Sequence, residues 1–166
     1  MAALPLTITT AGLAALINAQ NTGASAVVID SIGLSPTQIA VTADTAVIPG
    51  EVKRLAAVAG QVVSDDTIHV SVYDQTTDTY SVRTLAVYLS DGTLFAAYSQ
   101  AALIAEKAGP SMVLLDADIR LSSAIADNIE FSGGGWVNPP ATEGVAGVLR
   151  LATAAGAGGG GNHSRP

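Results

Sequence analysis

The sequence predicts a mainly β fold of the α+β class, in which a short N-terminal helix packs on an antiparallel β sandwich or barrel-like head and an extended strut follows. Three observations predict it. Apolar side chains recur at helical spacing near the start of the chain, β-prone stretches fill most of the rest, and clusters of turn-forming residues separate these stretches. One helix followed by seven or eight short strands with hairpin connections is typical of such heads.

A helix is the first expected element, and it begins at Thr9 or Thr10, because a threonine hydroxyl accepts a hydrogen bond from a free N–H of the first turn. Gly23 follows its expected end. One stripe at helical spacing is expected to pack on a sheet or a neighbouring subunit: Leu13, Leu16, Ile17 and Gln20.

The clearest strand follows Thr67, where apolar and polar side chains alternate. The alternation predicts a buried face, Ile68, Val70 and Val72, opposite a polar face, His69, Ser71 and Tyr73. Other β-prone stretches predict further strands: residues 27–34, 38–43, 80–89, 94–98, 112–121 and 125–131. Residues 54–63 suit a strand or a buried helix, and residues 101–108 suit a loop or a short helix. The sequence SDGT at 90–93 predicts a hairpin turn.

The composition restricts the classes of function. The net charge of −7 argues against duplex DNA or RNA as the main partner, because phosphate binding requires a basic face. The sequence contains no uninterrupted run of about 18 apolar residues, so we expect no membrane insertion. The N-terminus also lacks the basic start of a signal peptide. The absence of cysteine excludes disulfides, thiolate nucleophiles and Cys-based zinc sites. Only 13% of the residues are charged, and so neutral a surface suits contact with other subunits.

Three regions are expected along the chain: a head over residues 1–135, a connector over 136–153 and a Gly-rich flexible tail over 154–166. Pro139 and Pro140 favour an extended backbone, so the connector should leave the head as a stiff strut. Trp136 is expected to plug the junction between head and strut or a seam between subunits.

Residues that could support catalysis or bind a ligand are few. His69 has no second His or Cys at ligand spacing, and we interpret it as a solvated surface residue. Asp116 and Asp118 share one face of a strand; they could contribute to a cation site, but a solvated face is the preferred interpretation. Asp65 and Asp66 are expected to be turn residues. The glycines at 133–135 lack the Lys-Ser/Thr of a phosphate loop. We therefore expect no catalytic residue, no metal ligand and no cofactor, and we expect that the protein is not an enzyme.

Several stretches resemble the bacteriophage tail-collar fibre family, whose members form the N-terminal domain of many phage tail fibres. They occur in the family's order: residues 8–16 (ITTAGLAAL), 28–34 ending in IGL, 49–54 (PGEVKR) with its Glu and Arg, and the hairpin from 80–83 (YSVR) through 90–96 (SDGTLFA). Residues 141–153 are similar to the segment that often links such heads to the fibre shaft. The chain departs from the family at Thr84-Leu85-Ala86, where Glu-Ile-Gly is usual, so an ion pair or a tight approach there is in doubt.

The resemblance implies a structural virion protein that docks on the tail tip or baseplate, projects outward for host adsorption and is located in the tail. It also implies a homotrimer and, at the far end, a further fibre or receptor-binding protein. A single chain cannot bury the apolar side chains of a thin strand such as the connector, whereas three copies about one axis could. We therefore expect the trimer contact in the connector, at Val145, Val148, Leu149 and Leu151.

Alternative functions remain open. A carbohydrate-binding or adhesion module would use Trp136, Tyr73 and Tyr98 as stacking faces. The equivalent fibre of a phage-derived bacteriocin or a gene-transfer particle would have the same sequence features. A depolymerase is disfavoured, because no paired acids stand in a recognisable context.

Overall fold

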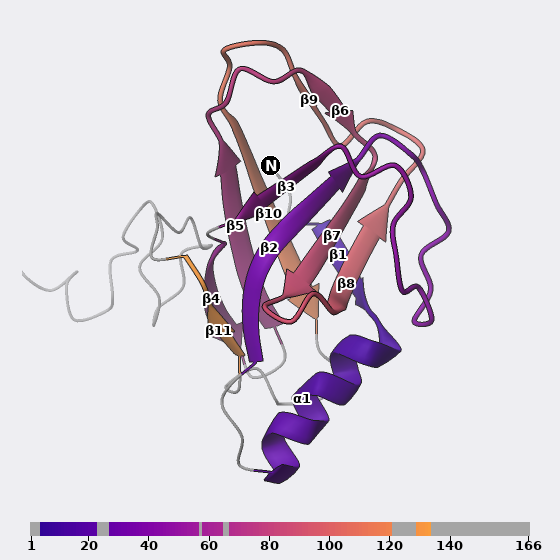
Figure 1. The fold of residues 1–166 in the computed structure, drawn as a ribbon, viewed down its shortest axis with the longest axis vertical. Coiled ribbons are helices and arrows are strands. Elements are labelled where there is room, and N and C mark those ends of the chain that lie inside the picture. The colour runs from indigo at the N-terminus through magenta and orange to yellow at the C-terminus, as the bar shows by residue number, and fades with distance from the viewer. Residues whose placement is uncertain (1–3, 23–26, 57, 65–66, 121–128, 134–166) are drawn as a thin grey trace, which may run out of the picture.

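The computed structural model describes residues 4–22, 27–56, 58–64, 67–120 and 129–133 (Figure 1). This part of the chain is mostly strand with one short helix, which confirms the mainly β class and the N-terminal helix. The elements are β1 (Leu4–Ile8), α1 (Thr10–Thr22), β2 (Val27–Ser35), β3 (Lys53–Ala56), β4 (Ala59–Ser64), β5 (Thr67–Asp74), β6 (Tyr80–Val82), β7 (Thr84–Leu89), β8 (Leu94–Ser99), β9 (Ala105–Lys107), β10 (Val113–Arg120) and β11 (Ile129–Phe131).

Nine strands form one curled sheet in the order β11-β2-β7-β8-β1-β10-β5-β4, with β3 also pairing β2, and β6 and β9 form a separate small sheet. Figure 1 shows α1 at one end of the curl and the β6–β9 pair at the other. The two end strands meet where Gly133 donates a backbone hydrogen bond to the Val58 carbonyl at 3.0 Å. A Cβ added to Gly60 on β4 would lie 2.1 Å from the Phe131 ring. The head is therefore barrel-like, which is one of the two expected forms.

The sheet is mixed, so the expectation of a purely antiparallel head is wrong at two pairings. Strand β1 runs parallel to β10, with Leu4 opposite Ala117. Strand β11 runs parallel to β2, with Ile129 opposite Val27. Both pairings join segments far apart in the sequence, whereas hairpin signals predict contacts between consecutive strands. Strand β1 itself has no counterpart among the expected elements.

Other boundaries also differ from the expectation. The single strand expected over 80–89 is two, β6 and β7, because Arg83 between them donates its backbone N–H to the Ser35 carbonyl at 2.8 Å. Residues 38–43 form no strand, and residues 105–107 form β9 where a loop or short helix was expected. The stretch over 54–63 supplies parts of two strands, β3 and β4, rather than a helix.

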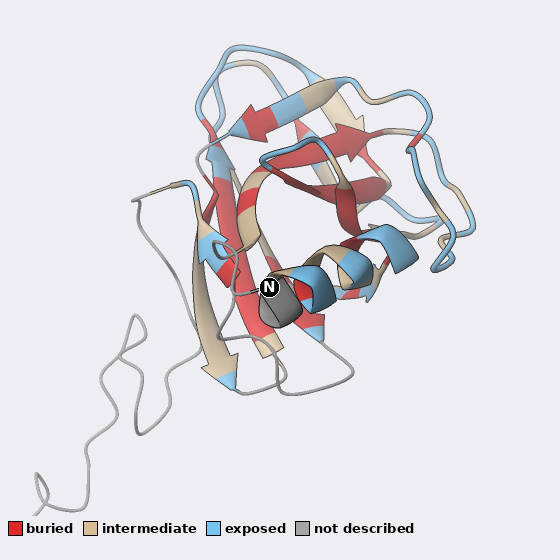
Figure 2. Cartoon of the chain, turned by 60° about the horizontal axis from the view of Figure 1, so that its bottom comes forward, coloured by how far each residue is buried: buried red, intermediate tan, exposed pale blue. Residues whose placement is uncertain are grey.

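The core fills the inside of the curl. Ile68, Val70 and Val72 are fully or almost fully buried, which confirms the predicted apolar face of β5. Figure 2 shows buried residues along the strands that surround the interior, and exposed residues on the outer side of α1. The hairpin at 90–93 is also confirmed, since it joins β7 to β8 with Gly92 at φ 87°.

Helix α1 docks on β8 through its first turn. The Thr9 hydroxyl accepts a hydrogen bond from Gly12 N at 3.0 Å, so Thr9 is the residue that caps the helix. The same hydroxyl donates to the Leu94 carbonyl at 2.5 Å and fixes the cap to the sheet. Leu16 is fully buried as expected, but Ile17 on the same predicted stripe is 43% exposed. Gly23 lies outside the described residues, as do Asp65 and Asp66.

Buried polar groups hold the β6–β9 end of the head. The Lys107 amine is buried and donates to the carbonyls of Thr76, Gly109 and Ser111 at 2.5, 2.9 and 2.5 Å. Burial would by itself raise the pKa of Asp74, but hydrogen bonds from the Tyr80 hydroxyl and from Thr76 lower it to about 2. These contacts tie the polar turn after β5 to β9 and to the loop before β10.

Gly12 offers a test of this docking, because an added Cβ would lie 2.4 Å from the Phe95 carbonyl oxygen and 2.8 Å from its Cα. Alanine gains up to about 1 kcal/mol of helix propensity over glycine. Overpacking against a backbone costs about 1–3 kcal/mol. We therefore expect Gly12→Ala to lower the free energy of unfolding measured in urea, although alanine has the higher helix propensity.

Ala14→Ser, at an exposed position of the same helix, serves as the control and should change the free energy of unfolding by less than about 0.5 kcal/mol. A Gly12→Ala variant more stable than the wild type would show that α1 does not approach β8 so closely.

Candidate functional site on the outer face of strands β5 and β10

Strands β5 and β10 pair in antiparallel register over their whole length, from Val113 opposite Asp74 to Arg120 opposite Thr67. Because alternate side chains of a strand point to opposite faces, the residues that alternate with the core positions Ile68, Val70 and Val72 lie on the face away from the core. Four of them form what we term the polar ladder: His69, Ser71, Asp116 and Asp118. Further along the same face lies the neutral end: Tyr73, Gln75, Met112 and Leu114.

The polar ladder is joined by hydrogen bonds across the two strands. His69 Nδ1 lies 2.7 Å from Asp118 Oδ1, and the Ser71 hydroxyl donates to Asp116 Oδ1 at 2.6 Å. His69 Nε2 lies 3.4 Å from Ser71 Oγ and 3.7 Å from Asp116 Oδ1. The imidazole therefore has a carboxylate near each ring nitrogen.

The prediction that His69 is a solvated surface residue is wrong, because the residue is only 4% exposed. Strand β5 is not an edge strand: Gln61 of β4 lies opposite His69 on one side and Asp118 of β10 on the other. The expected solvated face at Asp116 and Asp118 is also wrong. Both side chains are partly shielded from solvent, and both interact with His69.

The charges of the polar ladder support one another. The carboxylate of Asp116, and then that of Asp118, raise the pKa of His69 above its usual value, against the opposing effect of burial. Burial would raise the pKa of Asp116, but interactions with His69 and Ser71 outweigh it and hold that pKa below its usual range. The geometry thus favours a protonated imidazole between carboxylates.

Serine, histidine and aspartate side by side are the residue types of a nucleophilic triad, but this geometry does not suit one. The Ser71 hydroxyl donates to Asp116 rather than to His69, and Ser71 is buried, so its oxygen is not presented to a substrate. Within the described residues, no three His, Asp or Glu side chains are placed to hold a metal ion. The polar ladder is suited to holding a proton and joining two strands.

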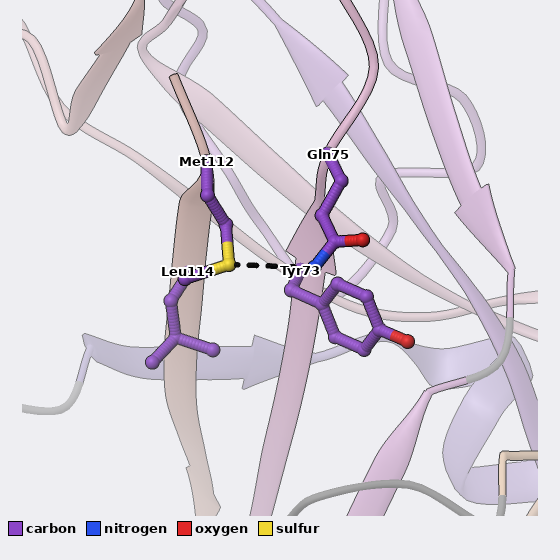
Figure 3. Close-up of a pocket in the computed structure, with 4 residues that line it drawn as sticks. All are labelled: Tyr73, Gln75, Met112 and Leu114. Atoms are coloured by element: carbon purple, nitrogen blue, oxygen red, sulfur yellow. Dashed lines mark hydrogen bonds between the residues drawn. The ribbon is translucent and has the colours of Figure 1, made fainter. Parts of the chain in front are cut away.

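The neutral end is open to solvent. Its four side chains line a pocket of about 200 Å³, with Tyr73 48% and Met112 61% exposed. Figure 3 shows Leu114 on β10 with Met112 just before that strand, beside Tyr73 on β5 with Gln75 just after it. The Gln75 amide donates to the Met112 sulfur at 3.7 Å. None of these side chains carries a charge, which sets the neutral end apart from the polar ladder.

A second cluster lies on β2, β3 and β7. Glu51 accepts two hydrogen bonds from Arg54, at 2.7 and 3.0 Å, and one from the Tyr88 hydroxyl at 2.9 Å. The Arg54 guanidinium also stacks 3.8 Å from the centroid of the Tyr88 ring. A Cβ on Gly33 would lie 2.4 Å from Glu51 Oε2, so this position admits the carboxylate because it is glycine. Burial, then the Glu51 carboxylate, raises the pKa of Tyr88 to about 12.

The departure from the fibre family at Thr84 leaves no gap in the hydrogen bonding. The Thr84 hydroxyl donates to the Thr37 carbonyl at 2.6 Å. Arg83 donates to the carbonyls of Ala101 and Pro36, at 3.1 and 3.2 Å. In this chain, backbone carbonyls accept the hydrogen bonds of both side chains.

The structure does not bring the expected stacking residues together. Tyr73 is on β5 and Tyr98 on β8, with β1 and β10 between them. Tyr98 is partly buried, and its hydroxyl donates to Gln100 at 2.9 Å. The remaining predicted positions lie outside the described residues: Trp136, Pro139, Pro140, Val145, Val148, Leu149 and Leu151.

The polar ladder predicts a particular dependence of stability on pH. The stabilisation by protonated His69 is fully present below its unfolded pKa of about 6.5 and is lost as the pH rises through the raised native pKa. At pH 6, we expect His69→Gln to lower the free energy of unfolding by about 1–3 kcal/mol. The difference from the wild type should shrink toward pH 9, as measured by urea unfolding across this range.

His163→Gln removes the other histidine of the chain and is the matched control, which should keep the wild-type pH dependence. A difference between His69→Gln and the wild type that stays constant from pH 6 to 9 would mean that His69 is not charged in the native state.

Comparison with known proteins assigns no family to this chain. No protein-family model, no curated protein and no solved structure matches it. The one helix in the described part of the chain does not have the length and apolar character needed to span a membrane. The resemblance to tail-collar fibres therefore stays a prediction that rests on the residues quoted for it.

Proposed function

We propose that this chain is a phage tail fibre protein, or the N-terminal attachment part of one, that docks on the tail tip or baseplate and projects outward for host adsorption. The observation that carries the proposal is that the residues of the resemblance, far apart in the sequence, meet at the tight contacts of the head.

Two contacts support this argument. Thr9 and Gly12, from the first stretch, hold α1 against Phe95, from the hairpin stretch. Gly33, from the second stretch, admits Glu51, from the third. Each contact joins two of the resembling stretches, as expected if the stretches specify one head.

A structural role also agrees with how the head uses its ionisable groups. Glu51 joins Arg54 and Tyr88, and the carboxylates of the polar ladder join His69 and Ser71. These groups stabilise contacts between strands, whereas an acid or base in catalysis must reach a substrate. This favours attachment over chemistry.

The proposal includes a homotrimer, held in part by the apolar side of the connector. By light scattering on a size-exclusion column, we expect a mass near three times 16.6 kDa. Val148→Asp would bring three like charges together and should shift the mass to that of the monomer. Val47→Asp, at a position 74% exposed on the head, is the control and should stay trimeric. A trimer that survives Val148→Asp would contradict this contact.

The location in the tail is tested by immunogold electron microscopy. Antibodies raised against the purified chain should label the tail ends of particles released from cells that express it. Label on complete phage, on headless tails or on gene-transfer particles would distinguish the three carriers. Label that stays with the cell debris while the particles remain bare would contradict the proposal.

A further inference from the structure

The neutral end of the β5–β10 face has the character of a protein contact. Tyr73 and Met112 are among the large hydrophobic residues that the described head leaves exposed; Tyr73 lies on β5, and Met112 directly precedes the neighbouring strand β10. Tyrosine and methionine are enriched in the centre of protein interfaces, whereas charged residues are depleted there. The uncharged lining of this pocket fits that pattern.

The position of the neutral end relates it to the connector. The described chain ends at Gly133, whose N–H bonds to the Val58 carbonyl. Val58 directly precedes Ala59, which pairs with Ser71 of β5, so Gly133 lies one strand beyond β4. Since neighbouring strands are about 4.8 Å apart, the chain leaves the described head about 10 Å from β5, near Tyr73.

We propose that the neutral end of each head packs against a second copy of this chain, beside Gly133, which precedes the connector by three residues. If three connectors associate about one axis, their starting points converge on that axis, and a patch about 10 Å away converges with them. This inference rests on the trimer of the proposed function. It adds that the heads, and not the connectors alone, contact one another.

The charge of the face agrees with a second copy as the occupant. Copies that met through the polar ladder would bring Asp116 and Asp118 of several chains together, which costs free energy. Leu114 opposite Tyr73 is the uncharged pair next to that ladder, and Gln75 and Met112 continue away from it. Copies that meet through the neutral end leave the carboxylates outside the contact.

The size of the neutral end sets its expected contribution. A stable interface buries about 800 Å² on each partner, far more than four side chains supply. The head contact therefore acts together with the connector. Substitutions at the neutral end should weaken the trimer rather than abolish it.

The full chain has no cysteine, so one introduced thiol reports on this contact. Met112→Cys is treated with a short bismaleimide and run on a denaturing gel, where a contact between copies appears as a covalent dimer. Thiols held at an interface react at millimolar effective concentration, so at micromolar protein we expect at least about tenfold more dimer than from the control. The control is Val47→Cys, which is more exposed and lies in the loop between β2 and β3.

A second variant tests the same surface without a cross-linking reagent. Tyr73→Asp should raise the dissociation constant of the trimer by at least about tenfold, because it places like charges in the contact. Val47→Asp should leave it unchanged. A Tyr73→Asp trimer as tight as the wild type would overturn the inference, as would a Met112→Cys dimer yield equal to that of Val47→Cys.

Two further outcomes would reassign the surface. A double variant, Met112→Cys with Val148→Cys, that cross-links within single chains while Met112→Cys alone gives no dimer would make the chain's own connector the occupant. Binding on a glycan array that Tyr73→Ser abolishes, again with no Met112→Cys dimer, would make it a sugar site. Labelled tails in the immunogold experiment would leave the proposed function standing in either case.

Discussion

The whole head depends on one short strand, β1, which joins the two halves of the curled sheet. Its first residues pair with β10, and Thr7 and Ile8 pair with β8, so five residues connect the strands on both sides. Thr9 follows directly, and its hydroxyl caps α1 and binds the Leu94 carbonyl. The contact of β11 with β4 closes the opposite side. Without β1 these halves would have exposed edges and an open core.

The position of β1 also explains the chemistry of the outer face. Because β1 covers one edge of β10 and β4 covers one edge of β5, both strands of the pair are internal. Polar side chains there have neighbours on both sides, so they pair with each other and lose contact with water. The neutral end lies where both strands run out into loops, and its side chains stay exposed. One sheet face thus carries a stabilising part and an accessible part.

Sequence patterns predicted what depends on local order. The alternation in β5, the cap at Thr9 and the turn around Gly92 were all predicted, because each involves residues close together in the chain. The insertion of β1 and the pairing of His69 with Asp118 were not, since both require the register between distant strands. That polar residues alternate in both β5 and β10 was visible, but sharing a face does not reveal which residues meet. The burial of Lys107 had no signal, because its partners are backbone carbonyls.

The parallel pairing of β1 with β10 has a consequence for the order of events during synthesis. Of the described strands, β1 is made first, but its partner β10 ends at Arg120, and the strand that closes the curl ends at Phe131. Contacts of such long sequence separation form slowly, because the loop between them must be closed first. The nascent chain therefore carries β1 and α1 without β8 until Ser99 has been made, and β1 without β10 until Arg120 has been made. The head can complete its sheet only when nearly all of it has been made.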